Sequence, residues 1–147
     1  MKVIISMDKY TEIRPIVLGI VIKDNKLLVL EGFDEKKNEF FYRALGGGIE
    51  FGEKSDEALK REFLEELGIE IEIDKYLGLA ENIFEFNGRK AHELVLMYKI
   101  NIKDEDYKEN YVVNDDKGKF KGLWVDIQKF VKGEKRLYPQ EVFKYLV

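Results

Sequence analysis

Three glutamates, Glu62, Glu65 and Glu66, follow closely on a run of glycines at residues 46–48. Their spacing is the one at which side chains meet on one face of a helix. Crowded carboxylates raise one another's pKa, and a divalent cation relieves that repulsion. Mg²⁺ takes carboxylate oxygens and commonly shares its shell with substrate phosphates. The pattern therefore predicts a metal and phosphate site, where glycines let the backbone approach the ligands.

A solvated acidic helix face is the alternative interpretation of these glutamates. The chain is 37% charged, and Glu-rich faces are commonly only solvated. However, Leu59, Phe63 and Leu67 recur every four residues and predict a buried stripe on the same helix. On a helical wheel Glu62 and Glu66 lie next to this stripe instead of opposite it. The acidic face is therefore expected at the rim of a cleft.

The boundaries of this helix are predicted at residues 55 and 67. Ser55 is suited to the N-cap position, and Asp56 and Glu57 follow in the first turn, where the helix dipole favours acids. Gly68 is suited to end the helix in a left-handed conformation.

The rest of the chain is predicted to be mainly β-structure. Apolar or alternating runs predict strands at 13–22, 27–33, 39–47, 69–73, 79–86, 92–100 and 120–127. Turns are expected at 23–26 and at the Asn-Gly pair of residues 87–88. Pro139 is expected in the first turn of a closing helix over 139–147. These elements predict an α+β fold, a mixed β-sheet with helices on both faces, in a single domain over residues 1–147.

The composition narrows the possible functions. The net charge of −4 and the pI of about 5.3 argue against a general nucleic-acid binder. The chain contains no cysteine, which excludes disulfides, thiolate chemistry and cysteine-ligated zinc. The apolar run in residues 1–10 is too short for a signal peptide or a membrane span, so a cytoplasmic location without a membrane partner is expected.

The glutamates belong to a longer pattern of fixed spacing. Its elements are Gly47, Glu53 and the run Arg61–Ile69, "REFLEELGI". This pattern resembles the Nudix box at every fixed position, and the box covers residues 47–69. The order of the predicted strands, with "GLWVD" before a terminal helix, also resembles the α/β/α sandwich of Nudix hydrolases. One departure is Leu45, where many relatives carry proline, and it is expected to alter the stiffness of the loop.

The resemblance implies a reaction and a set of site residues. Nudix hydrolases cleave a nucleoside diphosphate linked to another group, with Mg²⁺ or Mn²⁺ bound by the box. Here Glu62, Glu65 and Glu66 resemble the metal ligands, with the backbone carbonyl of Gly47 or Gly46 completing the shell. Glu62 is also the candidate general base.

The remaining box residues resemble supporting groups. Arg61 resembles the residue that holds a catalytic glutamate in place, and on the helix it lies four residues from both Glu57 and Glu65. Glu53 resembles a structural acid of the loop, Gly48 a structural glycine, and Gly68 a helix cap.

Several residues outside the box are further candidates. Glu93 lies in an apolar strand, where an acid needs a partner or a function, so it is a candidate extra base or ligand; the alternative is a strand-end residue facing water. Asp115 and Asp116 are weaker candidates, expected to be plain loop residues. His92, the only histidine, is expected to be structural or solvated more readily than phosphate-binding.

The substrate is less clearly indicated. Phe84, Phe86, Tyr98 and Trp124 could stack on a base, although aromatic residues in strands commonly belong to the core. ADP-ribose hydrolases of the family carry a proline where this chain has Phe84. Dinucleoside polyphosphate hydrolases carry a tyrosine where it has Glu85 and Phe86. The lack of both marks favours a nucleoside triphosphate pyrophosphohydrolase that releases a monophosphate and pyrophosphate.

Two rival functions stay open at this point. A Nudix-like module that senses a nucleotide without cleaving it would bind the same kind of ligand. A simple divalent-ion binder would explain the glutamates, but not Gly47, Arg61 and Gly68 at fixed spacing. Some Nudix proteins are dimers, and nothing in the sequence decides whether this chain forms a homodimer.

Overall fold

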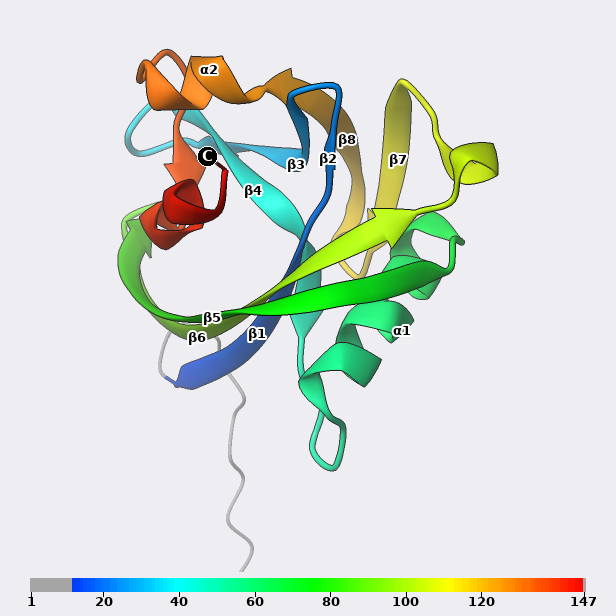
Figure 1. Cartoon of the computed structure of the whole chain (residues 1–147). Helices are drawn as coiled ribbons and strands as arrows, with labels where there is room; N and C mark the ends of the chain where they lie inside the picture. The colour runs from blue at the N-terminus through cyan, green and yellow to red at the C-terminus, as the bar shows by residue number, and fades with distance from the viewer. Residues whose placement is uncertain (1–11, 147) are drawn as a thin grey trace, which may run out of the picture.

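A mixed β-sheet forms the centre of the protein. The computed structural model describes residues 12–146 (Figure 1). Its strands are β1 Ile13–Ile20, β2 Ile22–Lys23, β3 Lys26–Asp34, β4 Glu39–Gly48, β5 Ile71–Phe86, β6 Arg89–Ile102, β7 Asn110–Asp115, β8 Gly118–Asp126 and β9 Leu137–Tyr138. The strand order is β5-β6-β1-β4-β3-β8-β7, with β2 paired to β3 and β9 to β4. β1 runs parallel to β6, and β9 runs parallel to β4.

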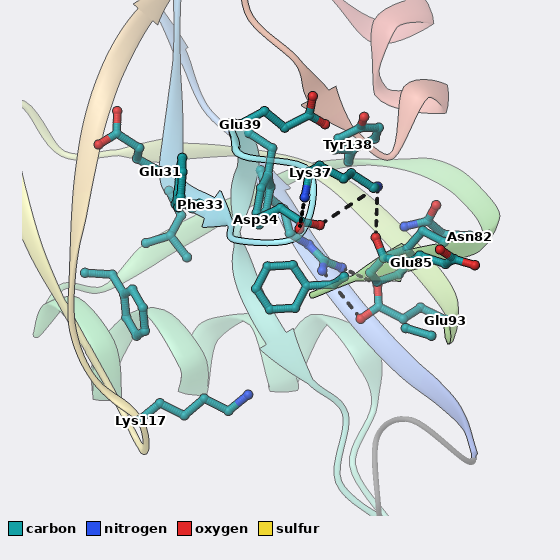
Figure 2. A pocket seen from close by; sticks show the side chains of 18 of the residues that line it. Glu31, Phe33, Asp34, Lys37, Glu39, Asn82, Glu85, Glu93, Lys117 and Tyr138 are labelled. Carbon is teal, nitrogen blue, oxygen red and sulfur yellow. Dashed lines mark hydrogen bonds and ion pairs between the residues drawn. The ribbon is translucent and has the colours of Figure 1, made fainter. Parts of the chain in front are cut away.

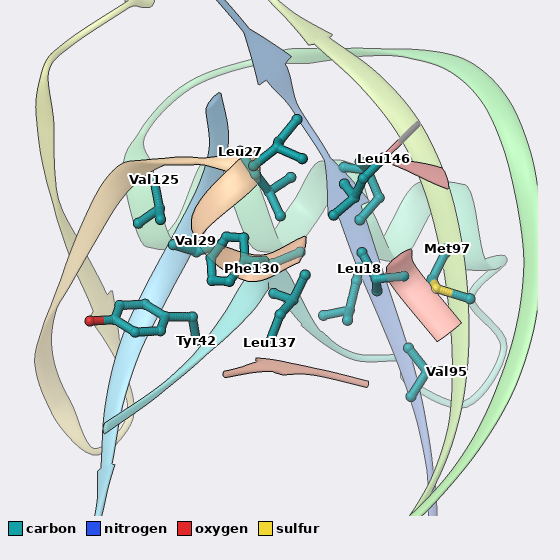
Figure 3. Close-up of a cluster of buried hydrophobic side chains, with 14 of the residues drawn as sticks. Leu18, Leu27, Val29, Tyr42, Val95, Met97, Val125, Phe130, Leu137 and Leu146 are labelled. Carbon is teal, nitrogen blue, oxygen red and sulfur yellow. The ribbon is translucent and has the colours of Figure 1, made fainter. Parts of the chain in front are cut away.

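Helices cover the sheet on two sides, as predicted. The helical segments are α1 Ser55–Leu67, α2 Ile127–Val131 and the 3₁₀ turns η1 Asp104–Asp106 and η2 Gln140–Tyr145. α1 packs Leu59 and Phe63 into one buried cluster. Phe130 of α2 and Val142 of η2 pack into a second cluster around Leu18 (Figure 3). Full burial of side chains of this size stabilises the fold by roughly 1.5–3 kcal/mol each.

Helix α1 has the predicted bounds, but its N-terminus is built differently. Lys54 is the N-cap residue and makes no side-chain capping bond. Ser55 is instead the first residue of the helix. Its Oγ lies 2.6 Å from the hydroxyl of Tyr98 on β6, with which it forms a hydrogen bond. The C-terminus is as predicted, since Gly68 adopts a left-handed conformation and its N–H donates to the Leu64 carbonyl.

The two strands predicted at 69–73 and 79–86 are one long strand, β5. It pairs with β6 almost throughout, with register shifts between Ile73 and Lys75 and between Tyr76 and Gly78. The bulges bend the strand without ending it, and this is why the residues between the two predicted segments lack a clear alternating pattern. The predicted Asn87-Gly88 turn is confirmed, with positive φ at both residues.

The C-terminal third differs most from the prediction. Strand β7 and helix α2 were not predicted, and residues 140–145 form a 3₁₀ turn instead of an α-helix. Pro139 is the N-cap of that turn and not part of its first turn. Short segments of this kind hold their conformation through packing, as the burial of Val113, Phe130 and Val142 shows.

Two expectations concern residues beyond the described range. The single-domain prediction extends over residues 1–11 and Val147, and the short apolar run of residues 1–10 lies outside the described residues altogether. Within residues 12–146, no helix is long and apolar enough to cross a membrane.

Candidate functional site

The glycine run continues strand β4 and does not form a loop. A Cβ on Gly46 would lie 1.9 Å from the Val17 carbonyl oxygen of β1, the strand that pairs antiparallel with β4 at this point. A Cβ on Gly47 would lie 2.4 Å from the carboxyl carbon of Glu62. The strand predicted over 39–47 is confirmed and extends to Gly48, so Leu45 lies in a strand, and the expectation that it alters the stiffness of a loop is wrong. Gly46 therefore leaves room for the backbone of β1, and Gly47 leaves room for the carboxylate of Glu62.

Arg61 connects the box residues to one another. Its guanidinium donates to both carboxylate oxygens of Glu53, at 2.7 and 3.0 Å. It also donates to Glu62 at 2.9 Å and to Glu65 at 3.2 Å. A further bond, of 2.9 Å, reaches the carbonyl of Gly48 in β4. Arg61 therefore pairs with Glu65, as one of the two predicted partners, and not with Glu57.

Glu53 holds the loop that precedes α1. Besides the Arg61 bonds, its Oε1 accepts a hydrogen bond from the backbone N–H of Glu50. Hydrogen bonding from Arg61, followed by that from Glu50, lowers the pKa of the Glu53 carboxyl. Arg61 is itself only 22% exposed, and its pKa is raised, chiefly by Glu53. The pair keeps both charges and fixes the loop to the helix.

Glu66 lies in the most crowded part of the acidic face. Burial, with a hydrogen bond and charge repulsion from Glu62, raises the pKa of Glu66 to about 9. Asp115 and Glu65 contribute further repulsion. Glu65 is more peripheral, with a side chain 60% exposed against 14% for Glu62.

Asp115 reaches this site from strand β7, and the expectation of a plain loop residue is wrong. Tyr111 and Val113 belong to the buried cluster under α1. Because strand side chains alternate, Asp115 lies on the same face of β7, two residues farther along. Asp116, by contrast, lies beyond the strand, in the β7–β8 turn.

The acidic face has the chemistry of a divalent-ion site. Its donors are carboxylate oxygens. Burial and repulsion raise the pKa of Glu66, and a Cβ on residue 47 would fill the space that the Glu62 carboxylate occupies. Hard cations such as Mg²⁺ prefer these donors. Within residues 12–146, no three acidic or histidine side chains converge as a ready-made metal shell. Glu62 and Glu65 are instead turned to Arg61.

A cavity of about 510 Å³ adjoins the acidic face through Asp115, which lines the cavity and contributes repulsion at Glu66. Figure 2 shows side chains that line this cavity. Asp115 and Arg14 line it at the side near the box. The aromatic residues of its walls are Phe33, Phe41, Phe84, Phe86, Phe120 and Tyr138. Phe41 and Phe86 meet edge to face with ring centroids 5.5 Å apart. Aromatic walls of this kind are typical of a site for a flat ligand, and the charged residues that also line the cavity suit a ligand that carries charge.

Other predicted candidates lie away from this cavity. The Tyr98 hydroxyl contacts Ser55, and the Trp124 ring packs on Tyr107 and donates to the Lys108 carbonyl. His92 Nε2 is buried without a hydrogen-bond partner among the described residues, and His92 does not line the cavity. Of the four aromatic candidates, Phe84 and Phe86 therefore belong to the cavity.

Glu93 has a partner inside the fold. Its side chain is 6% exposed and accepts hydrogen bonds of 2.7 and 3.4 Å from Arg43. Arg14 approaches the same carboxylate at 3.9 Å. The alternative of a water-facing residue at the strand end is therefore wrong. Arg43 and Arg14 were missed by the sequence analysis, because their partner is far away in the sequence.

Comparison with known proteins agrees with the box and the fold. The family model described as NUDIX domain matches residues 13–146. The chain therefore belongs to the Nudix family, which makes it a Nudix-type pyrophosphohydrolase acting on nucleoside diphosphate derivatives. No curated protein matches the chain.

Solved structures share the fold at low identity. A MutT protein from Methanosarcina mazei Go1 is 18% identical, with a TM-score of 0.64 and 96% of each chain covered. A MutT protein from Bacillus halodurans is 20% identical, with a TM-score of 0.61, over 91% of this chain and 82% of the other. A NUDIX hydrolase from Nitrosomonas europaea is 20% identical, with a TM-score of 0.60, over 90% and 85%. At this identity, the likeness shows the fold alone.

Proposed function

We propose that the protein hydrolyses a pyrophosphate bond in a nucleoside triphosphate or a modified nucleotide, with Mg²⁺ or Mn²⁺ as the cofactor. The observation that carries the proposal is the position of the acidic face of α1 beside an aromatic-walled cavity, linked to it by Asp115. A base against the aromatic wall leaves the phosphates to extend toward the box. The missing subgroup marks at Phe84 and Glu85 favour a triphosphate substrate.

The metal would be held by Glu62, Glu65 and Glu66, with the backbone carbonyl of Gly47 or Gly46 as a further ligand. When bound, it would neutralise the phosphate oxygens and lower the pKa of a coordinated water. Because burial and the neighbouring carboxylates raise the pKa of Glu66, a metal that binds this face would compete with a proton on Glu66.

The side chains of the box have separate roles in the proposed reaction. Glu62 accepts a proton from the attacking water, whose oxygen forms a bond to phosphorus. The phosphoanhydride bond breaks, and its electron pair leaves with the pyrophosphate. Arg61 and Glu53 are positioning residues, because Arg61 holds Glu62 and Glu65 while Glu53 holds Arg61. In phosphoryl chemistry such positioning accounts for much of the rate.

Product analysis tests the proposal directly. The protein is incubated with Mg²⁺ and a panel of nucleoside triphosphates, oxidised nucleotides, nucleotide sugars and dinucleoside polyphosphates. We expect one class to give a nucleoside monophosphate, and a chelator to stop the reaction. If nothing turns over while a nucleotide raises the melting temperature, the non-hydrolytic sensing function takes the place of the enzyme.

A further inference from the structure

A second charge cluster lies in the cavity wall outside the Nudix box. It consists of Arg14 on β1, Arg43 on β4 and Glu93 on β6. Arg43 binds the Glu93 carboxylate through both terminal nitrogens, at 2.7 and 3.4 Å. Arg14 adds a contact of 3.9 Å to the same carboxylate (dashed lines at Glu93 in Figure 2 mark ion pairs of this cluster). Two guanidinium groups share one carboxylate, so the cluster carries an excess positive charge.

The two arginines differ in how firmly Glu93 holds them. Arg43 is 23% exposed and makes true hydrogen bonds, so its planar group is fixed. The Arg14 contact is too long for a hydrogen bond, and its side chain is 38% exposed. Its N–H donors are therefore available to an anionic ligand that enters the cavity.

The cluster lies between the aromatic wall and the box. A Cβ on Gly48 would lie 3.5 Å from Nη2 of Arg14, so the guanidinium of Arg14 lies beside strand β4. The neighbouring residue of this strand, Gly47, lies against the carboxylate of Glu62. Toward the aromatic wall, Phe84 of β5 pairs with Ala91 of β6, and Ala91 is two residues from Glu93 on the same strand. All three residues line the cavity. Both arginines line the cavity, and Arg14 is the one beside the glycine strand, so a nucleotide whose phosphates extend from this wall toward Gly47 would meet Arg14.

We propose that Arg14 and Arg43 form an anion subsite that binds the phosphate group next to the nucleoside of the substrate. This inference rests on the proposed function. Guanidinium groups bind phosphate oxygens in a bidentate geometry that lysine does not reproduce. Glu93 is a positioning residue, because its carboxylate compensates the buried charge of Arg43 and orients that group toward the cavity.

The test measures phosphate binding without catalysis. The metal-free protein, in chelator at low salt, is titrated calorimetrically with AMP, GMP, CMP and UMP and with the four matching nucleosides. We expect at least one monophosphate to bind about 10-fold more tightly than its nucleoside, because charge-assisted bonds contribute that much. If no monophosphate is preferred over its nucleoside, the subsite is overturned, whatever the protein hydrolyses.

Variants then assign the preference to the cluster. Arg14→Gln is expected to remove most of the monophosphate preference and to leave nucleoside binding unchanged. The matched control is Lys99→Gln, which removes one positive charge from an exposed residue outside the cavity. An equal loss in both variants shows a general charge effect and overturns the assignment to Arg14.

Arg43 is tested in a double variant, because its removal alone leaves Glu93 buried and unpaired. Arg43→Gln with Glu93→Gln removes both charges and is expected to abolish the monophosphate preference. Glu93→Gln alone keeps both guanidinium groups but removes the carboxylate that orients Arg43. It is therefore expected to weaken this preference less than the double variant does, and to lower kcat less than Glu66→Gln does, since positioning losses are smaller than ligand losses. A loss of kcat in Glu93→Gln as large as in Glu66→Gln makes Glu93 a ligand or base, and overturns its positioning role.

Discussion

The Arg61 cluster and the Glu93 cluster contain the same two residue types in opposite proportions. In the first, Arg61 is shared by Glu53, Glu62 and Glu65, so carboxylates are in excess. In the second, Glu93 is shared by Arg43 and Arg14, so guanidinium groups are in excess. The first cluster is suited to a cation and the second to an anion.

This difference shows how the site divides its work. Partly buried charges interact more strongly than solvated ones, so an unbalanced cluster attracts a ligand of the opposite sign. Gly47 lies against Glu62 of the first cluster and Gly48 lies beside Arg14 of the second, so consecutive residues of β4 contact the two clusters. The following variants alter one cluster at a time.

Glu66→Gln is expected to have the largest effect on activity. It removes a carboxylate of the proposed metal-binding face while keeping the size of the side chain. We expect kcat to fall by more than about 100-fold, because a metal ligand contributes at least as much as its supporting residues. Steady-state kinetics with Mg²⁺ measures this, and Glu57→Gln, on an exposed part of the same helix, is the control. Wild-type turnover in Glu66→Gln contradicts the metal assignment.

Arg61→Gln is expected to lower kcat by about 10- to 100-fold, the range for residues that support metal ligands. The lost bonds are those to Glu53, Glu62 and Gly48. Arg61→Lys keeps the charge but cannot reproduce the fork of bonds, so we expect it to recover little activity. Full recovery in Arg61→Lys shows that charge alone matters. Lys60→Gln, exposed on the same helix, is the control.

Three alanine substitutions in the glycine run distinguish the glycine needed for stability from the glycine needed for activity. Gly46→Ala is expected to destabilise the protein by more than about 2 kcal/mol, because its Cβ meets the Val17 carbonyl. Gly47→Ala is expected to reduce activity more than stability, because its Cβ displaces Glu62. Gly48→Ala is the matched control, with its nearest atom at 3.5 Å. Denaturant unfolding measures the stability of all three variants, and steady-state kinetics measures their activity. Equal losses of stability and of activity in the three variants would contradict the expected order.

The smallest expected effect is a pH dependence of stability in the metal-free protein. The folded pKa of Glu66, about 9, is above its ordinary value of 4.5. The folded state therefore binds more protons than the unfolded state between these values, and unfolding free energy falls as pH rises from about 5 to 9. Glu66→Gln lacks this loss, so its melting temperature at pH 8 is expected to exceed the wild-type value, and the difference is expected to shrink toward pH 5. Parallel pH profiles of the two proteins, measured in chelator, contradict the shift.

Local patterns in the sequence determined helix α1 and the family. The stripe of Leu59, Phe63 and Leu67 predicts α1, Gly68 predicts its end, and the spacing from Gly47 to Ile69 identifies the box. These features are readable because a helix repeats over a few residues and its side chains are neighbours in sequence.

The tertiary structure alone decided what surrounds that helix. Asp115 approaches Glu66 because β7 packs on α1, and Arg14, Arg43 and Glu93 meet because β1, β4 and β6 lie side by side. No periodicity reports contacts between residues so far apart, since strand pairing and bulges depend on the whole sheet. Sequence spacing therefore identified the side of the site suited to a cation, and strand order assembled the side suited to an anion.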